Sequence, residues 1–388
     1  MKKHQITAAV FLMLALGAAI AAGFSFLSMR KPETIVKGPG VSEVKMLSDW
    51  FPGLKGSAGD TEVYILKPAA SQETPEATKT EAASDASMLI LGGTHPNEPA
   101  GFMAAVLLIE NALPSSGTFY VIPRANASGF THNDPQEGSP QRFTIKTANG
   151  SRTFRYGSRA TNPIHQWPDP DVYIHASSGQ KLSGSETRNL NRGYPGRPDG
   201  TLTEKVCYGI TEMIKAEKIT ITVDLHEASP EYPVNMAMVA HPKSMDLASS
   251  TVIGLEMQDI AISLEPSPVN LRGLTHRELG DFTDTLPVLM ETPNASQGRL
   301  RGKTDEALVL TGKDKWYVRA QKLGRLYVPY DEKGHPLEER VGRHLAGISE
   351  LAFSWTMLNE NRPLEFSGLP TFAEIQENGL GTWLKDVN

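Results

Sequence analysis

The sequence predicts an α/β protein that is built around a largely parallel or mixed β-sheet. Short apolar runs of strand length alternate along the 388 residues with longer stretches in which apolar residues recur at helical spacing. Hydrophobic residues make up 39% of the chain, which is enough for a sizeable core. Such alternation is typical of folds whose functional sites lie beyond the carboxyl ends of the strands, so we expect a site there.

The first 30 residues are predicted to be a signal peptide or a signal anchor. Lys2 and Lys3 precede an uncharged run over 6–27, which as a helix would extend about 33 Å and cross the core of a bilayer. Small residues near its end suit cleavage, whereas its length and the following Arg30 and Lys31 suit the uncleaved anchor that we favour. We therefore expect an exported protein, periplasmic or extracytoplasmic, which an uncleaved segment would anchor to the inner membrane.

After the leader, strands and helices are predicted in alternation. The expected strands are 61–66, 88–91, 119–122, 219–225 and 286–290, and the expected helices are 101–112, 202–216 and 341–358. Residues 69–87 are rich in Ala, Ser, Thr, Glu and Pro and indicate a mobile loop or linker. Residues 126–188 carry few apolar runs and indicate a long decorated loop.

These segments divide the chain into four predicted parts. The leader, 1–30, is followed by an N-terminal segment with a strand and a linker, 31–87. The main domain is expected over 88–358, with the loop insertion at 126–188, and a C-terminal tail over 359–388.

Charge and cysteine content exclude several kinds of protein. The net charge of −6 and the pI of about 6.0 argue against a surface that neutralises phosphates, so nucleic acid is not expected as a partner. A single cysteine, Cys207, excludes an internal disulfide and a thiolate-rich zinc cluster. Any metal must therefore be held by histidines and carboxylates.

The first candidate for such a site is His95-Pro-Asn-Glu98. It follows the buried strand 88–91 and a Gly-Gly break and precedes a helix, so a loop histidine and a first-turn glutamate can converge on one cation. A second His-x-x-Glu pair, His335 with Glu338, follows no buried strand and is interpreted as solvated surface.

His226, at the end of the strand 219–225, is the predicted third protein ligand. Asp224 lies two residues earlier on the same face of the strand and is expected to orient the imidazole, whereas Glu227 points to the opposite face. Two histidines and one glutamate leave a fourth position for water, which is the arrangement of catalytic rather than structural zinc sites.

Two further features suggest how a substrate would be handled. Asn191 and Arg192 place an amide beside a guanidinium fork, a combination that binds a carboxylate. Glu291 ends the apolar strand 286–290, where partial desolvation raises the pKa of a carboxyl toward the range of a general base.

In chain order, Gly-Gly-Thr-His95-Pro-Asn-Glu98, Asn189-Leu-Asn191-Arg192, Asp224-Leu-His226-Glu227 and Glu291-Thr-Pro resemble the succinylglutamate desuccinylase/aspartoacylase family of zinc-carboxypeptidase-like hydrolases. The resemblance covers roughly residues 88–358. It implies a mixed sheet sandwiched by helices and one zinc ion held by His95, Glu98 and His226. It also implies Asn191 and Arg192 on the substrate carboxylate and Glu291 as general base and acid.

Within its motifs, the chain departs from the family pattern at two points. Asn189 stands where the family usually has Asp. The family's further arginine, which polarises the scissile carbonyl, has no clear match, and Arg188, Arg155 and Arg159 are candidates. Of these, Arg188 adjoins the motif and is included among the expected substrate-binding residues.

The expected function is zinc-dependent hydrolysis of an amide bond next to a free carboxylate, as in an N-acyl amino acid. The substrate would be a small molecule or peptide with a free carboxylate. An alternative is a metallocarboxypeptidase that acts on peptides or cell-wall stem peptides. Alternatives of other classes are a catalytically inactive module that binds carboxylates and a membrane-tethered structural protein whose metal only stabilises folding.

Overall fold

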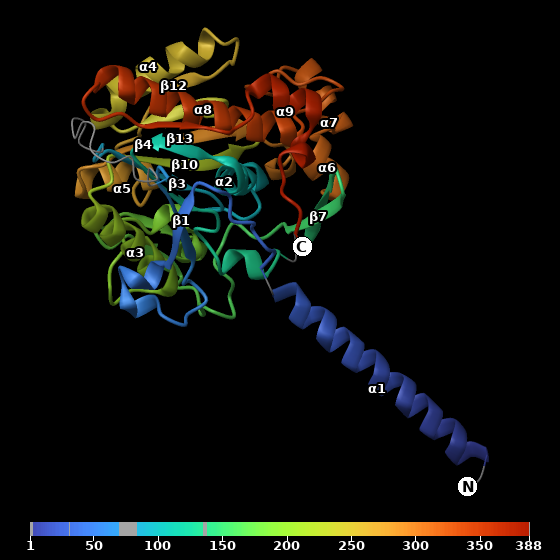
Figure 1. The fold of residues 1–388 in the computed structure, drawn as a ribbon. Helices are drawn as coiled ribbons and strands as arrows, with labels where there is room; N and C mark the ends of the chain where they lie inside the picture. Colours follow the sequence, from blue (N-terminus) through green and yellow to red (C-terminus); the bar gives the residue numbers. More distant parts are fainter. Residues whose placement is uncertain (1–2, 31, 70–83, 135–137, 388) are drawn as a thin grey trace, which may run out of the picture. The chain divides into compact units, whose positions relative to one another are not determined.

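The computed structural model describes residues 3–30, 32–69, 84–134 and 138–387, which form two compact units, Met1–Thr34 and Ile35–Asn388. The first unit consists of helix α1, Lys3–Arg30 (Figure 1). Its stretch Lys3–Leu27 has a mean hydropathy of 2.3 and is, among the described helices, the one long and apolar enough to cross a membrane. Signal sequences near an N-terminus have the same property.

The second unit is organised around a mixed sheet of eight strands, as the α/β prediction requires. The strand order is β1-β2-β5-β3-β10-β13-β11-β12, and β5, β3, β10 and β13 run parallel to one another. In that order the strands are Val41–Met46, Glu62–Leu66, Thr118–Ile122, Ser87–Leu91, Ile221–Ala228, Leu286–Pro293, Ala237–Ala240 and Ser263–Pro266. The carboxyl ends of β3, β10 and β13 therefore lie side by side.

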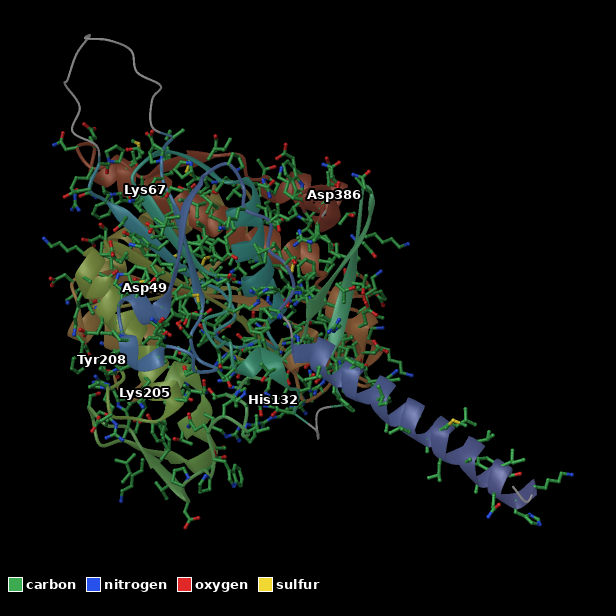
Figure 2. All side chains as sticks on the ribbon, turned by 60° about the horizontal axis from the view of Figure 1, so that its bottom comes forward. Asp49, Lys67, His132, Lys205, Tyr208 and Asp386 are labelled. Carbon is green, nitrogen blue, oxygen red and sulfur yellow. The ribbon has the colours of Figure 1, made fainter. Side chains whose placement is uncertain are left out.

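Helices cover both faces of this sheet, which confirms the predicted sandwich (Figure 1). One face carries α2 (Pro99–Asn111), α4 (Met245–Glu256) and α8 (Leu337–Leu358), and the other carries α3 (Leu202–Glu217) and α5 (Thr275–Phe282). Figure 2 shows exposed charged side chains, Lys67 and Asp386 among them, at the outside of this unit.

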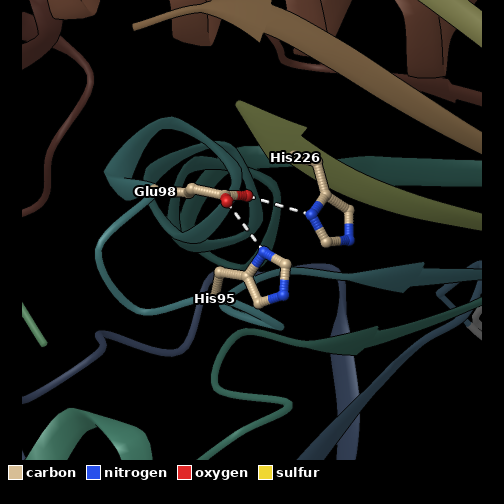
Figure 3. Close-up of side chains that lie close together, drawn as sticks. All are labelled: His95, Glu98 and His226. Carbon is tan, nitrogen blue, oxygen red and sulfur yellow. Dashed lines mark hydrogen bonds and ion pairs between the residues drawn. The ribbon is translucent and has the colours of Figure 1, made fainter. Parts of the chain in front are cut away.

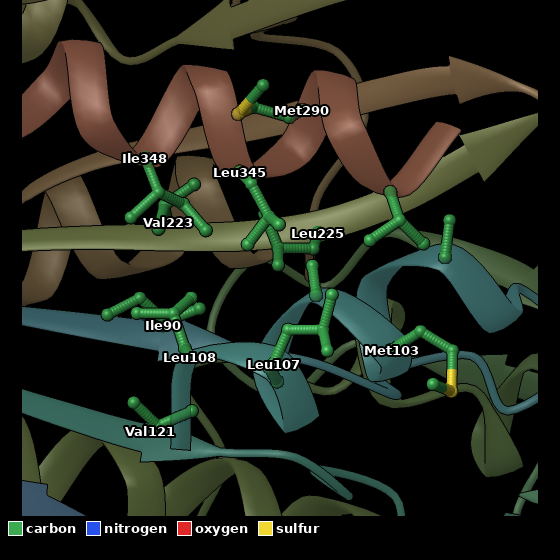
Figure 4. Close-up of a cluster of buried hydrophobic side chains, with 14 of the residues drawn as sticks. Ile90, Met103, Leu107, Leu108, Val121, Val223, Leu225, Met290, Leu345 and Ile348 are labelled. Carbon is green, nitrogen blue, oxygen red and sulfur yellow. The ribbon is translucent and has the colours of Figure 1, made fainter. Parts of the chain in front are cut away.

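Along the central strands, the alternation of residues determines which side chains lie on each face of the sheet. Val223 and Leu225 of β10 pack into the core between β10, α2 and α8, and so does Met290 of β13 (Figure 4). Because successive residues of a strand point to opposite faces, Asp224 and His226 project toward the α5 face. The side chains of Asp224 and His226 are thus separated from the largest apolar core by the backbone of the sheet.

Helix α2 lies directly on β10. A Cβ on Gly101 would overlap the carbonyl oxygen of Leu225, so only glycine permits this approach. Glu227 stabilises the contact between α2 and β10, because it accepts a hydrogen bond from Ala100 N (2.9 Å). It also forms a buried ion pair with Arg340 of α8. Glu227 therefore faces away from His226, as predicted.

The predicted strands and helices all occur, with shifted ends. Several elements were not predicted: β1, β11, β12, α4 and α5 in the unit just described, and the short helices α6 (Glu306–Thr311) and α7 (Lys315–Lys322). Most of the linker predicted at 69–87 lies outside the described residues, whose gap there is 70–83. Residues from Ile35 on belong to the main unit, because β1 and β2 form one edge of its sheet.

Two segments differ from their predictions. Residues 126–188, predicted as a long decorated loop, hold two hairpins among their described residues, β6–β7 (Arg142–Thr147, Gly150–Arg155) and β8–β9 (Val172–Ile174, Lys181–Ser183). The first hairpin turns at Ala148 and Asn149, and Gly150 begins its second strand. The segment 359–388 is not a free tail: β14 (Glu365–Ser367) pairs with β4 (Leu113–Ser116), and α9 (Phe372–Asn378) buries Ile375 in the core.

Candidate metal centre

His95, Glu98 and His226 meet at the carboxyl ends of β3 and β10 (Figure 3). Nδ1 of His95 lies 2.7 Å from Oε1 of Glu98, and Nδ1 of His226 lies 2.9 Å from Oε2 of the same carboxylate. One ligand atom from each residue lies within 4.8 Å of the other two, and all three side chains are at most 2% exposed. The structure thus brings together the three residues that the sequence selected as ligands.

The loop between β3 and α2 positions two of these side chains. Gly93 has a φ of +64°, and a Cβ there would lie 2.7 Å from the ring of Phe130, so the turn requires glycine. Glu98 precedes α2 as its N-cap rather than lying in the first turn, and its Oε2 accepts a hydrogen bond from Glu227 N at 3.0 Å. The carboxylate is therefore anchored to β10, beside His226.

Asn189 determines which nitrogen of His95 is available to a cation. Its Oδ1 lies 2.9 Å from Nε2 of His95 and also accepts from Asn191 N, while its Nδ2 donates to Glu186. With the amide oriented in this way, Nε2 of His95 must carry the proton that it donates to Oδ1. A neutral His95 then presents the lone pair of Nδ1 to the Glu98 carboxylate, and a cation between these two electron-pair donors would be favourable.

Asp224 lies next to His226, as its place on the same face of the strand predicts. Its Oδ2 lies 2.9 Å from Nε2 of His226, although the pair is not aligned as a hydrogen bond. The carboxylate is held by the hydroxyls of Thr94 (2.7 Å) and Thr275 (2.6 Å), so it is buried but satisfied. The expectation that Asp224 shares a face with His226 is confirmed.

The electrostatics of the cluster favour a positive charge at its centre. Burial, reinforced by Arg159, lowers the pKa of His95 to about 4, so this ring is neutral near pH 7. Burial opposes the charged forms of Glu98 and His226 as well, yet the neighbouring rings of His95 and His226 lower the pKa of Glu98, and the carboxylates of Asp224 and Glu98 raise that of His226. Without a metal the cluster therefore holds a proton on His226, and a divalent cation would displace it.

Glu291 stands beside this cluster. It is the register partner of His226 on the neighbouring parallel strand, and it lines the same cavity. Its Oε2 is buried without a hydrogen-bond partner, and burial raises the pKa of the carboxyl to about 8. An unpaired, partly desolvated carboxyl next to a cation site has the properties of a general base.

Asn191 and Arg192 line that cavity too, which has a volume of about 320 Å³. Oδ1 of Asn191 accepts a hydrogen bond from the backbone N–H of Thr275 at 2.8 Å, whereas the single proton of the Thr275 hydroxyl goes to Asp224. This orients the amide so that Nδ2 is left to donate to a ligand. Arg192 is half-buried beside it, with Nη1 bonded to the Asn191 carbonyl and Nε 3.7 Å from Glu186.

Of the three candidate arginines, only Arg159 lines the cavity. Its Nη1 lies 3.3 Å from Nδ1 of His95 and 3.4 Å from Oε1 of Glu98. The structure does not bring Arg188 to the site, because its guanidinium binds Asp169 (2.7 and 3.0 Å) and a backbone carbonyl. Arg155 donates to the carbonyl of Phe130 and also lies outside the lining.

The prediction that His335 belongs to a solvated surface is wrong. The residue is 8% exposed, with Nε2 bonded to Pro329 O (2.8 Å) and Nδ1 3.1 Å from Glu339 rather than from Glu338. It lies outside the metal cluster, and its role is to pack. The charged turn before it suggested exposure, but contacts with the ring of Tyr330 bury the imidazole.

Several cavity residues gave no signal in the sequence. Tyr232, His276 and Gln297 come from two loops and from the helix α5, which itself was not predicted. Asn189 appeared only as a departure from a motif, yet it holds His95.

A scan of protein-family models and a search of curated proteins each found no match. Solved structures similar to this chain include a succinylglutamate desuccinylase from Silicibacter sp. TM1040, at 16% identity and a TM-score of 0.35, over 62% of this chain and 55% of that chain. The cell shape determinant protein Csd4 from Helicobacter pylori is similar at 13% identity and a TM-score of 0.44, over 82% of this chain and 59% of that chain. A metallo-carboxypeptidase from Burkholderia cenocepacia is similar at 11% identity and a TM-score of 0.45, over 86% and 68%.

The family that the motifs resemble and the metallocarboxypeptidases are therefore both represented among the similar structures. The chain spans little more than half the length of the desuccinylase. The function proposed for this chain is based on the geometry of the site and not on these similarities.

Proposed function

We propose that this protein is a zinc-dependent hydrolase of an amide bond adjacent to a free carboxylate, of the N-acyl amino acid deacylase type. One observation supports this most: two imidazole nitrogens and a carboxylate converge in a buried cluster beside the unpaired Glu291, in one cavity with the carboxylate-binding pair Asn191 and Arg192. A cation site, a base and a substrate anchor are the three parts that such a reaction needs.

The residues present fit a zinc ion. His95, Glu98 and His226 would hold it through nitrogen and oxygen atoms, the donors that zinc prefers, and other divalent ions can occupy such a set. When bound, zinc would lower the pKa of a water from 15.7 to about 7 and polarise the scissile carbonyl.

Residues of the chain would then transfer the proton, bind the substrate carboxylate and stabilise the carbonyl oxygen. A carboxylate oxygen of Glu291 takes the proton of the attacking water and returns it to the leaving nitrogen. Nδ2 of Asn191 and the guanidinium of Arg192 hold the substrate carboxylate, which is a positioning role. Arg159, rather than Arg188, donates to the carbonyl oxygen as negative charge develops on it.

The location of this activity follows from the N-terminal helix. We propose that α1 acts as a signal or an anchor and that the unit Ile35–Asn388 works outside the cytoplasm. Its substrates would then be carboxylate-bearing compounds of that compartment.

The test is a mass-spectrometric screen of N-acyl amino acids, their C-terminal carboxamides and short peptides with the full-length chain in detergent. We expect cleavage of the free carboxylates, loss of activity with a chelator and recovery with added zinc. Faster cleavage of peptides would favour the metallocarboxypeptidase alternative, and binding without turnover would favour the inactive module. Equal rates on carboxamides, or no effect of the chelator, would contradict the proposal.

Asn189→Ala is expected to weaken zinc binding by about 10- to 100-fold, because nothing then holds the proton on Nε2 of His95. Asn189→Asp keeps an acceptor at the same position and is expected to bind zinc at least as tightly as the natural protein. The measurement is competition with a chromogenic chelator, with Asn149→Ala as the control, since Asn149 binds Asp386 at the surface. Unchanged zinc affinity in folded Asn189→Ala would show that the contact does not matter.

A further inference from the structure

One part of the cavity is apolar, and the proposed function leaves it unused. Its lining consists of Val239, Leu271, Leu274 and Leu289 together with Pro268, and we call it the apolar lobe. Leu289, Val239 and Leu274 are only 3%, 5% and 6% exposed. A further side chain placed among them would lose most of its contact with water.

The sheet places the apolar lobe next to the proposed base, Glu291. Leu289 lies two residues before Glu291 on β13, and its register partner on the antiparallel strand β11 is Val239. The intervening Met290 and its partner Met238 belong to the core under α8. Because side chains alternate along a strand, Leu289 and Val239 project to the opposite face, as Glu291 does. The paired Leu289 and Val239 therefore form a wall next to the base.

The lobe is also tied to the carboxylate anchor. Leu274 immediately precedes α5, whose first residue, Thr275, holds the amide of Asn191. A substrate whose carboxylate binds Asn191 and Arg192 and whose carbonyl lies at the metal cluster has, between these two groups, one carbon that carries a side chain. The apolar lobe lies within reach of that carbon, because all of these groups line one cavity of about 320 Å³.

Charge distribution decides what kind of side chain fits. The charged residues of the lining are Glu98, Glu227, Glu291, Arg159 and Arg192. Four of them have parts in the proposed reaction, and Glu227 is paired with Arg340. Within the described chain, no charged group of the lining is left over to pair with an acidic or a basic substrate side chain.

His276 of α5, which also lines the cavity, does not supply such a charge. Its Nδ1 is hydrogen-bonded to the hydroxyl of Ser267 (2.8 Å), and burial lowers its pKa to about 3, so the ring is neutral. Arg277, the next residue, donates to the carbonyl of Ser267 and approaches Asp281 rather than lining the cavity. A charged side chain in the lobe would thus be buried without a partner, which is strongly unfavourable.

We propose that the apolar lobe receives an uncharged aliphatic side chain, carried by the substrate residue that bears the free carboxylate. This inference rests on the proposed function and narrows its substrates to acyl derivatives, or peptides, of amino acids such as leucine, valine or methionine. It excludes acidic amino acids as preferred leaving groups.

The experiment compares three N-acetyl amino acids, with an apolar, an acidic and a basic side chain, on the zinc-loaded, full-length protein. N-acetyl-L-leucine should have a kcat/KM about 10-fold or more above that of N-acetyl-L-aspartate and N-acetyl-L-lysine. Leu271→Arg, at a half-buried loop position, should reduce this preference and raise the relative rate on the aspartate derivative. Leu323→Arg, 62% exposed after α7, is the matched control and should leave the preference unchanged.

A second measurement separates this inference from the proposed function. N-methanesulfonyl-L-leucine, -aspartate and -lysine contain no cleavable amide, and their binding can be followed by calorimetry. Tighter binding of the leucine compound by about 10-fold supports the lobe's role even if no amide is cleaved. Cleavage of acetylaspartate at least as fast as acetylleucine, equal binding of the three compounds, or no binding of any of them would overturn the inference.

Discussion

Replacing Glu291 with glutamine should leave zinc bound and lower kcat by about 10²-fold or more, the usual cost of losing a general base. Glutamine has nearly the shape of glutamate, so the cavity and the neighbouring His226 should keep their places. It cannot accept a proton, however, so the attacking water would have to lose its proton without a base beside it. Zinc content per chain and single-substrate kinetics measure the two parts of this expectation.

The pH profile distinguishes a base from a merely structural carboxylate. Burial raises the pKa of Glu291 to about 8 in the metal-free site, and a divalent cation beside it lowers that value. Because the base works only when deprotonated, kcat/KM should rise with pH along a limb below pH 8, and Glu291→Gln should lose this limb. Glu265→Gln, on the edge strand β12, is the control that should keep it. Unchanged turnover in Glu291→Gln would remove Glu291 from the mechanism.

The central part of the fold could be predicted because its strands carry strong local signals. Buried runs such as 88–91 and 286–290 have few polar residues, and all five predicted strands occur in the sheet. The edge strands β1 and β12 were missed because their residues are mostly exposed or half-buried, without clear alternation. Their pairing comes from neighbouring strands, which a local pattern does not reveal.

The same difference between local and tertiary information applies to the site. His95, Glu98, His226 and Glu291 follow apolar strands, and parallel strands place their carboxyl ends together, so a reader of the sequence can expect these residues to meet. Arg159 does not follow an apolar strand, so no local pattern in the sequence predicts its position. It lies outside any strand or helix, and its position depends on how the segment after the β6–β7 hairpin returns to the cavity.

Replacing Arg192 with alanine should remove the preference for substrates with a free carboxylate. The half-buried guanidinium lies beside Asn191, where it is partly shielded from water, and removing one partner of such a charged contact lowers kcat/KM by about 10²-fold. The loss should appear with N-acyl amino acids and be small with their carboxamides, which carry no charge to bind. The measurement is the ratio of kcat/KM for each carboxylate and its carboxamide.

Arg188 is the matched control, since the sequence assigns the same role to it while the structure pairs it with Asp169. Arg188→Ala should lower the melting temperature, because it leaves the Asp169 carboxylate without its ion-pair partner, but it should keep the carboxylate-to-carboxamide ratio of the natural protein. If Arg192→Ala reduced the rates on both substrate series equally, Arg192 would be a structural residue. If instead Arg188→Ala changed the ratio, the carboxylate would bind nearer to Arg188 than the cavity lining indicates, and the orientation proposed for the substrate would be wrong.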